Sequence, residues 1–264
     1  MHQTVGVDLA VQPRDTAICV VTWDEDDVRA EFVETPGDEE LAAHLGAHLA
    51  DPTVTHIGID VPLGWPQDFA RAINGYMSAP SGSWIVDGRS FAEASYFRLR
   101  ETDRHVVRRF GGRQTPLSVT SDRIGAVAMK AAWLLTLLAE EHEVDRAGVT
   151  GKILEVYPAA ALRAWNLGLP HYRQLKRRDW PGAERRILEV LQHHGVPTGT
   201  FPEGLLNEHQ FDAFICAVIA EARQRHQTEL PTPAVRATAQ LEGWIHVPVE
   251  VAFAEMFSTP GPTM

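Results

Sequence analysis

The sequence predicts an α/β fold built around one mixed sheet. Strand patterns come first, at residues 4–11, 16–23 and 28–34, and short turn-like segments separate them. A helical pattern precedes a fourth strand at residues 55–64, and helices alternate with strands beyond it. Strands joined by short turns are expected to pair antiparallel, whereas a strand reached through a helix is expected to be parallel. We therefore expect three antiparallel strands followed by parallel strands, flanked by helices.

The helix between the third and fourth strands is expected at residues 38–50. Its sequence, DEELAAHLGAHLA, has acidic residues in the first turn, where the helix dipole favours negative charge. Later in the chain, Ser121 and Asp122 mark the start of a long helix. The remaining expected elements are helices at 66–74, 102–109, 121–142, 159–166, 181–194 and 208–226, a strand at 152–158 and an extended segment at 243–248.

Residues 64–120 differ in composition from the rest of the chain. Gly, Ser, Pro, Arg and scattered aromatic residues dominate this segment. Long stretches with little regular structure are uncommon unless functional, so an insertion or lid over a site is expected. Its aromatic residues Trp65, Trp84 and Tyr96 either stack on nucleic-acid bases or form a small satellite core. With no repeat and no interdomain linker, residues 1–264 are expected to form a single domain.

The composition is that of an ordinary globular protein. The net charge of −11 argues against a protein that coats nucleic acid non-specifically. No apolar run is long enough to span a membrane, and the N-terminus lacks a signal-peptide pattern, so we expect no membrane partner. The two cysteines are far apart and in no metal-binding spacing, which favours a cytoplasmic location.

Basic residues are concentrated in two segments. Residues 98–123 and 163–186 carry seven Lys and Arg residues each. Two local basic patches on an acidic protein suit recognition of a phosphate-bearing ligand. Two solvated surface faces would have the same composition, and both interpretations stay open.

Asp8 interrupts an apolar strand, VGVDLAV at residues 5–11. Because side chains alternate along a strand, Gly6, Asp8 and Ala10 share one face and the larger apolar residues share the other. Two very small side chains thus flank the acid, and we expect open space beside the carboxylate. A buried charge costs free energy unless something pairs it, so Asp8 is a candidate site residue.

Asp60 repeats this arrangement on the strand at residues 55–64. Gly58 and Asp60 share one face, opposite the larger side chains. Two carboxylates on adjacent parallel strands make a plausible divalent-metal site. Either residue alone could instead be a turn former at a strand end.

A further candidate group lies on the expected helix at 208–226. Glu208, His209 and Asp212 are three or four residues apart, so they can project from the same side of its first turns. Acidic residues near a helix N-terminus are also favoured by the dipole without any function. Asp212, however, stands where an apolar side chain would normally pack.

Glu155 is a third acid inside an apolar strand. Its neighbours on the same face, Ile153 and Tyr157, are bulky rather than small. Glu155 is therefore either a site ligand or a residue in an ion pair that supports the site.

Seven motifs in order carry a resemblance to a known family: GVDLA, GIDVPLGWP, RETDR, PLSVTSDRIG, LEVYPAA, HQFDAFICAVIA and EGWIHVP. They span residues 4–248 and resemble the family called domain of unknown function 429. That family is described as predicted nucleases of ribonuclease H-like fold, similar to the Holliday-junction resolvases. Fold alone does not fix function.

The resemblance implies a two-metal phosphodiesterase acting on nucleic acid or another phosphodiester. Asp8 would bridge two Mg²⁺ or Mn²⁺ ions, Asp60 would hold one of them, and Asp212 with His209 would complete the site. Glu155 matches a family motif and joins the expected catalytic residues, although a resolvase-like site does not obviously need an acid there.

Four residues are expected to bind substrate. Arg104 and Arg123 belong to the polar RETDR and TSDR motifs, and Tyr172 and Lys176 lie in the second basic segment. Their functional role would be to contact substrate phosphates or bases. The alternative for the first two, with neighbouring acids such as Asp103, is an internal salt-bridge network that holds residues 64–120 in place.

Two other functions remain open. A nucleotide-dependent phosphotransferase or ATPase shares the same superfamily fold, but such enzymes usually need a second domain and a glycine-rich phosphate loop. A non-catalytic module that binds an anion or nucleic acid would keep the fold without the chemistry. Retention of all three expected aspartate ligands counts against the second alternative.

Overall fold

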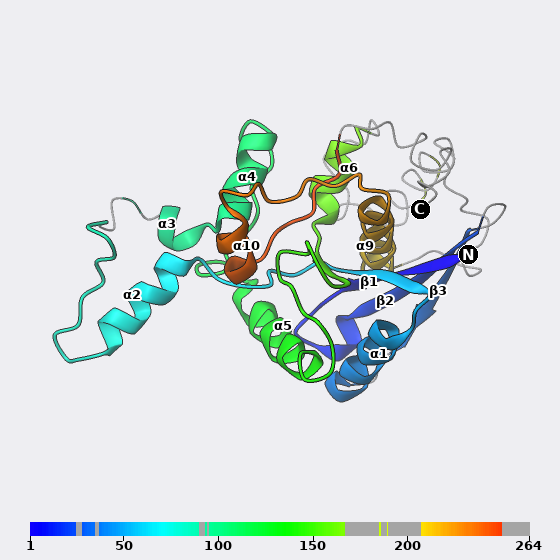
Figure 1. Ribbon diagram of the computed structural model, residues 1–264, viewed down its shortest axis with the longest axis horizontal. Helices are drawn as coiled ribbons and strands as arrows, with labels where there is room; N and C mark the ends of the chain where they lie inside the picture. The colour runs from blue at the N-terminus through cyan, green and yellow to red at the C-terminus, as the bar shows by residue number, and fades with distance from the viewer. Residues whose placement is uncertain are drawn as a thin grey trace.

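A computed structural model describes residues 1–24, 28–34, 37–89, 95–166 and 207–249, with the single positions 93, 185 and 189. The expected helix at 181–194 lies outside the described residues except for two positions. Among the described helices, none is long and apolar enough to cross a membrane. Figure 1 shows a sheet at one side of the molecule and helices that extend away from it on the other.

Five strands form one mixed sheet in the order β3-β2-β1-β4-β5. β1 pairs antiparallel with β2, β2 pairs antiparallel with β3, and β4 is parallel to both β1 and β5. The strands are β1 (His2–Asp8), β2 (Ala17–Trp23), β3 (Val28–Val33), β4 (Val54–Ile59) and β5 (Ile153–Glu155). The ribonuclease H-like topology expected from the sequence is confirmed.

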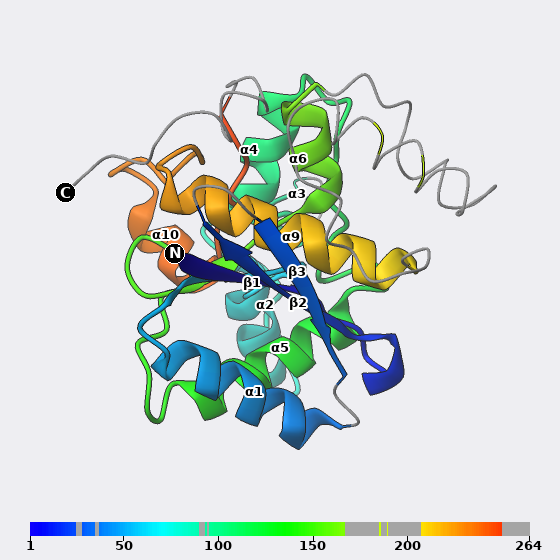
Figure 2. The ribbon, with the colours of Figure 1, turned by 90° about the vertical axis from the view of Figure 1, so that its right-hand side faces the viewer.

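Helices cover both faces of this sheet (Figure 2). α9 (Glu208–Gln224) and α6 (Pro158–Ala164) pack on one face, where Cys19 and Cys216 are among the buried residues. α1 (Asp38–Ala50) and α5 (Gly125–Leu138) pack on the other, against Val5, Val7 and Ile57. The alternation predicted for β1 therefore divides its side chains between two separate apolar layers.

The small residues beside Asp8 and Asp60 have a different role from the one expected. A Cβ atom on Gly6 would collide with the backbone of Ala213 and Ala217, and one on Gly58 would lie 2.6 Å from the carbonyl oxygen of Cys216. The space that these glycines leave is therefore filled by the backbone of α9. The expectation that these glycines create open space was wrong: they let the helix approach the sheet closely.

Residues 64–120 contain α2 (Gln67–Met77), α3 (Ser95–Arg98) and α4 (Glu101–Arg109). α2 and α3 project away from the sheet at the left of Figure 1. A small apolar cluster holds them together, with Ala72, Val86 and Phe97 buried and Trp84 packed against them. Of the two roles proposed for the aromatic residues, Trp84 has the satellite-core role.

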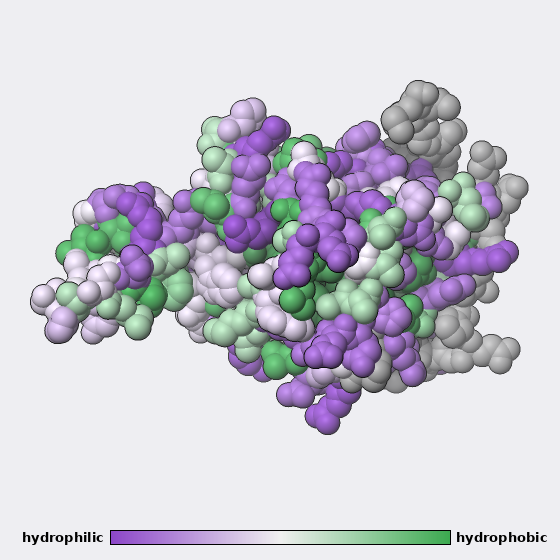
Figure 3. Space-filling model, turned by 60° about the horizontal axis from the view of Figure 1, so that its bottom comes forward, coloured by the Kyte–Doolittle hydropathy of each residue, from purple (hydrophilic) through white to green (hydrophobic). Residues whose placement is uncertain are grey.

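Apolar side chains are also exposed on this projecting part (Figure 3): Ile73, Tyr76, Met77 and Ile85.

A second set of contacts ties these helices to α10 (Arg236–Glu242) near the C-terminal end of the described chain. The Glu242 carboxylate accepts hydrogen bonds from the backbone N–H of Gln67 at 2.8 Å and of Glu101 at 2.7 Å. Those residues begin α2 and α4, so a single acid satisfies donors at two helix N-termini.

Several element boundaries differ from the sequence-based ones. The helix expected from residue 121 begins at Gly125, because the Asp122 carboxylate closes a turn by accepting from the N–H of Ser118 at 2.7 Å. Residues 243–248 form only isolated bridges, one of which pairs Ile245 with Glu155.

Candidate active site

Three aspartates meet at one edge of the sheet. Asp8 is the last residue of β1, and Asp60 directly follows β4. Because the two strands are parallel neighbours, their carboxyl ends reach the same edge, and the N–H of Asp60 donates to the carbonyl of Val7 at 2.9 Å. Asp212 comes from the second turn of α9, which crosses β1 at Gly6. The glycine contact thus brings the helix aspartate to the two strand aspartates.

The three carboxylates are close enough to share one ligand. One oxygen from each of Asp8, Asp60 and Asp212 lies within 4.8 Å of the others. Asp212 is buried, and the other two are half-buried. Carboxylate oxygens are the ligands that hard divalent cations such as Mg²⁺ and Mn²⁺ prefer, so this donor set fits such an ion. A cation would also offset the repulsion among three crowded negative charges. We call these three residues the aspartate triad.

The start of α9 is fixed by a capping box. The Asn207 side chain accepts from the N–H of Gln210 at 2.9 Å, and the Gln210 side chain accepts from the N–H of Asn207 at 3.1 Å. The cap sets the helical position of each residue that follows. His209 and Asp212, one turn apart, consequently both face the end of β1.

His209 contacts the triad through Asp8. Its Nδ1 atom lies 2.7 Å from Oδ2 of Asp8, and its Nε2 atom lies 4.0 Å from a Glu208 oxygen. The sequence-based interpretation placed His209 among the metal ligands. In the structure the Nδ1 atom is engaged by a triad carboxylate, and metal ligation by His209 stays a prediction.

Cys216 lies beneath the triad and is completely buried. Burial raises the pKa of its thiol well above the ordinary value, and the negative charges of Asp60, Asp8 and Asp212 raise it further. The thiol is therefore protonated at neutral pH. Nucleophilic chemistry by this cysteine is excluded, because the thiolate is the reactive form.

Glu155 forms a buried ion pair with Arg100. Its oxygens lie 2.7 and 2.8 Å from the two terminal nitrogens of the guanidinium, and the N–H of Leu63 donates to it at 3.0 Å. Burial raises the pKa of the Glu155 carboxyl, while Arg100 opposes that shift. The structure thus gives Glu155 the ion-paired position that the sequence left open as an alternative. Its oxygens are not among those of the triad, and a catalytic role for it stays a prediction.

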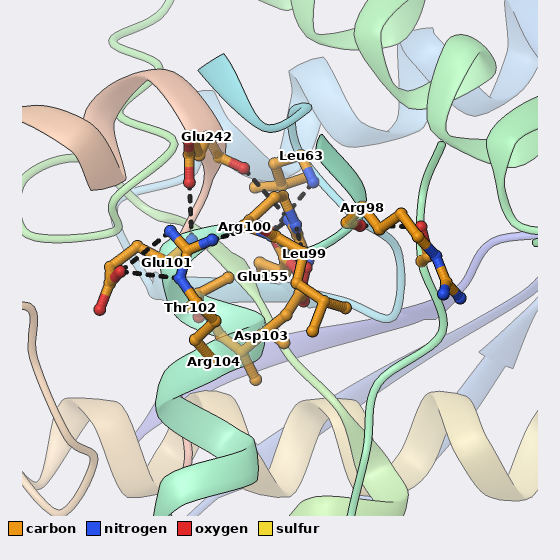
Figure 4. Close-up of polar contacts among 12 residues, drawn as sticks. Leu63, Arg98, Leu99, Arg100, Glu101, Thr102, Asp103, Arg104, Glu155 and Glu242 are labelled. Atoms are coloured by element: carbon orange, nitrogen blue, oxygen red, sulfur yellow. Dashed lines mark hydrogen bonds and ion pairs between the residues drawn. The ribbon is translucent and has the colours of Figure 1, made fainter. Parts of the chain in front are cut away.

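Arg100 has every donor engaged (Figure 4). Its five N–H groups donate to both oxygens of Asp103, both oxygens of Glu155 and the carbonyl of Glu242, at 2.7 to 3.1 Å. Asp103 also accepts from the backbone N–H of Arg100 and so caps α4. We call Arg100, Asp103 and Glu155 the arginine cluster. It joins α4, β5 and the end of α10, and it leaves no guanidinium donor for a substrate phosphate.

Of the four predicted substrate-binding residues, the structure describes Arg104 and Arg123. Arg104 pairs with Glu101 at 3.0 Å and donates to the carbonyl of Leu99 at 2.6 Å, which is the internal network proposed as its alternative role. Arg123 is exposed. Tyr172 and Lys176 lie outside the described residues. Substrate binding by these four residues stays a prediction.

A cavity of about 250 Å³ lies between the triad and the arginine cluster. Asp8 and Asp60 contribute to its lining, as do Arg100 and Glu155. Pro116 and Leu117 supply part of the wall, so residues 64–120 do reach the site. Sequence analysis did not single out Leu117, and it considered Tyr157 only as a neighbour of Glu155. Neither residue lies in a motif that would have identified it as part of the cavity lining.

No curated protein and no solved structure matches this chain. The family described as "Protein of unknown function (DUF429)" matches residues 6–236, a range that contains the aspartate triad, the arginine cluster and both glycine contacts. The family resemblance noted from the seven sequence motifs is confirmed. This chain belongs to the DUF429 family.

Proposed function

We propose that the protein is a metal-dependent phosphodiester hydrolase, with the aspartate triad as its metal site. The observation that carries the proposal is the convergence of three carboxylates within 4.8 Å from β1, the end of β4 and α9. Three oxygen donors at this spacing suit Mg²⁺ or Mn²⁺. The partner would be nucleic acid or another phosphodiester, as the sequence resemblance implies.

The residues of the site have separate tasks in this proposal. Asp8, Asp60 and Asp212 would hold the cation, and His209 would keep Asp8 oriented through its hydrogen bond. A bound divalent cation lowers the pKa of a coordinated water and stabilises the negative charge that develops on a phosphodiester. The arginine cluster would hold β5 and α4 in place beside the cavity, because its guanidinium donors are already used.

The proposal is tested by a cleavage screen with Mn²⁺ or Mg²⁺. The substrates are bis(p-nitrophenyl) phosphate and single-stranded, duplex, hybrid and branched nucleic acids. Asp8→Asn and Asp212→Asn are expected to lower the rate by more than about 100-fold, because loss of a residue that only supports a ligand already costs 10- to 100-fold. Addition of EDTA should have the same effect on the wild type.

Asp87→Asn is the matched control, because Asp87 is an exposed carboxylate whose partner is Arg71. It should leave the rate unchanged. Cleavage that persists in Asp8→Asn would contradict the proposal. Cleavage of no substrate, together with a heat of binding for ATP and Mg²⁺, would favour the phosphotransferase instead.

A further inference from the structure

The cavity beside the triad has two kinds of wall. At one end lie the carboxylates of Asp8 and Asp60. Most of the remaining surface is apolar or aromatic, and it includes Leu117, Ile124 and Tyr157. The walls come from segments far apart in sequence: the ends of β1 and β4, the loop before α5, the end of β5 and Ile245. Such a site can hold a ligand that is charged at one end and flat and apolar at the other.

The arginine cluster limits what can bind at the other wall. Arg100 faces the cavity, but its five N–H groups are taken by Asp103, Glu155 and the carbonyl of Glu242. A second phosphate is therefore not expected to bind at that wall. The ligand places its phosphate near the aspartates and an uncharged group deeper in the cavity.

The volume of the cavity limits the size of the uncharged part of the ligand. About 250 Å³ is below the range of roughly 300–1,000 Å³ that is usual for drug-sized ligands. One nucleoside is of suitable size, whereas a base pair is too large. A base that is still paired and stacked inside a duplex cannot enter such a pocket unless it is first extruded.

We propose that this cavity binds one unpaired nucleobase, on the nucleotide whose phosphate lies at the aspartate triad. The inference rests on the proposed function and narrows its substrate to a free nucleotide or an unpaired nucleotide of a single strand. Tyr157 and the aliphatic walls contact the faces of the base, an interaction that every base can make and that does not select sequence. Pro116 and Leu117 give residues 64–120 a direct role in substrate binding.

The pocket is tested by binding in Ca²⁺, which measures affinity independently of turnover. Isothermal titration compares thymidine 5′-monophosphate with 2-deoxyribose 5-phosphate, which lacks the base. The nucleotide is expected to bind at least 10-fold more tightly, as base–aromatic stacking alone supplies about 5- to 150-fold per base. A second arm compares a single-stranded hexathymidylate with the mononucleotide, which separates a strand substrate from a free nucleotide. The same hexathymidylate is compared with a blunt duplex, whose paired bases should bind more weakly.

Leu117→Trp fills the cavity from a half-exposed position and should remove the preference for the nucleotide over the sugar phosphate. Leu117→Ala enlarges the cavity and should weaken that preference only a few-fold, which covers the case in which the larger residue disturbs folding. Leu230→Trp is the control, because Leu230 is a similarly exposed leucine, 41% against 37%, that does not line the cavity.

Equal affinity for thymidine 5′-monophosphate and 2-deoxyribose 5-phosphate would overturn the proposal that the cavity binds a base. A preference for the nucleotide that persists in Leu117→Trp would do the same. These outcomes are distinct from failure of the proposed function. Cleavage without any base-dependent affinity would refute base binding in the cavity and support the metal site. Base-dependent affinity without any cleavage keeps the pocket and removes the hydrolase.

Discussion

Two groups of carboxylates lie next to the same cavity, and they differ in the contacts that the structure describes for their oxygens. In the arginine cluster, Asp103 and Glu155 share a buried guanidinium at 2.7 to 3.1 Å. In the aspartate triad, three carboxylates lie within 4.8 Å of one another, and Asp8 contacts His209, whose charge depends on its protonation. The arginine cluster contains a permanent cation, and the triad has the oxygen donors that a divalent cation prefers.

This difference suggests separate roles for the two groups of carboxylates at one edge of the sheet. A buried, fully hydrogen-bonded ion pair links secondary-structure elements, and replacing either partner strongly destabilises the fold. Three carboxylates within 4.8 Å of one another form a donor set for a divalent cation. The first group is therefore expected to control stability, and the second to control binding and catalysis.

The largest expected effect is on stability, in Arg100→Met. Two carboxylates that are almost fully buried would lose their cation, which costs about 3–5 kcal/mol of unfolding free energy. Urea denaturation at pH 7 measures this cost. Arg108→Ala is the control, because its ion pair with Glu101 is exposed and such pairs contribute about 0–1 kcal/mol. Similar losses in the two variants would contradict the structural role of the cluster.

Gly6→Ala tests how the triad is assembled. Its Cβ would collide with the α9 backbone, so α9 must move away from β1 at a cost of about 3 kcal/mol, the upper end of ordinary overpacking. Affinity for Mn²⁺ should fall as well, because Asp212 moves with the helix. Gly46→Ala provides the contrast, since nothing lies within 3.8 Å of its added Cβ and a helical alanine is favoured by about 0.5–1 kcal/mol. If Gly6→Ala kept full Mn²⁺ affinity, the close approach would not determine the site.

The next effect concerns the cation and the triad itself. Mn²⁺ at 100 times its dissociation constant should stabilise the wild type by about 2.7 kcal/mol, and chelation should remove that gain. Asp8→Asn should lose the Mn²⁺-dependent gain while keeping or slightly raising its stability in EDTA, because one repelling charge is gone. Thermal unfolding with and without Mn²⁺ measures both effects. A large loss of stability for Asp8→Asn in EDTA would mean that the triad, like the arginine cluster, is structural.

The smallest expected effect is a pH dependence of stability that comes from His246. This buried residue stays uncharged in the folded state. Burial, and then Arg223, lower its pKa from 6.5 to about 3, so the ring stays neutral, between the Thr228 hydroxyl and the carbonyl of Ala147. The unfolded chain takes up a proton below pH 6.5 and the native state does not, so stability falls as the pH drops. The loss steepens below pH 6.5 and approaches about 1.4 kcal/mol per pH unit near pH 5.

His246→Gln should lessen that slope when unfolding is measured by urea at several pH values. The exposed residue His226 offers the control His226→Asn, which should keep the wild-type slope. An unchanged slope in His246→Gln would show that other groups cause the acid sensitivity.

Sequence periodicity was sufficient to predict the sheet and the three aspartates. Alternation along β1 and β4 assigns Asp8 and Asp60 to one face, and helix spacing places Asp212 and His209 together. What could not be predicted depends on contacts between distant segments. Arg100 and Glu155 are 55 residues apart, and nothing in either local pattern identifies the partner. Gly6 and Gly58 are compatible with open space or with a close helix, and only the packing of α9 decides between them.

Anomalous diffraction from crystals soaked in Mn²⁺ tests most directly whether the aspartate triad is a site for a divalent cation. We predict an anomalous peak within bonding distance of oxygens from Asp8, Asp60 and Asp212 in the wild type, and no peak at that position in Asp212→Asn. Crystals that contain Mn²⁺ elsewhere but show no peak between these three carboxylates would contradict the claim.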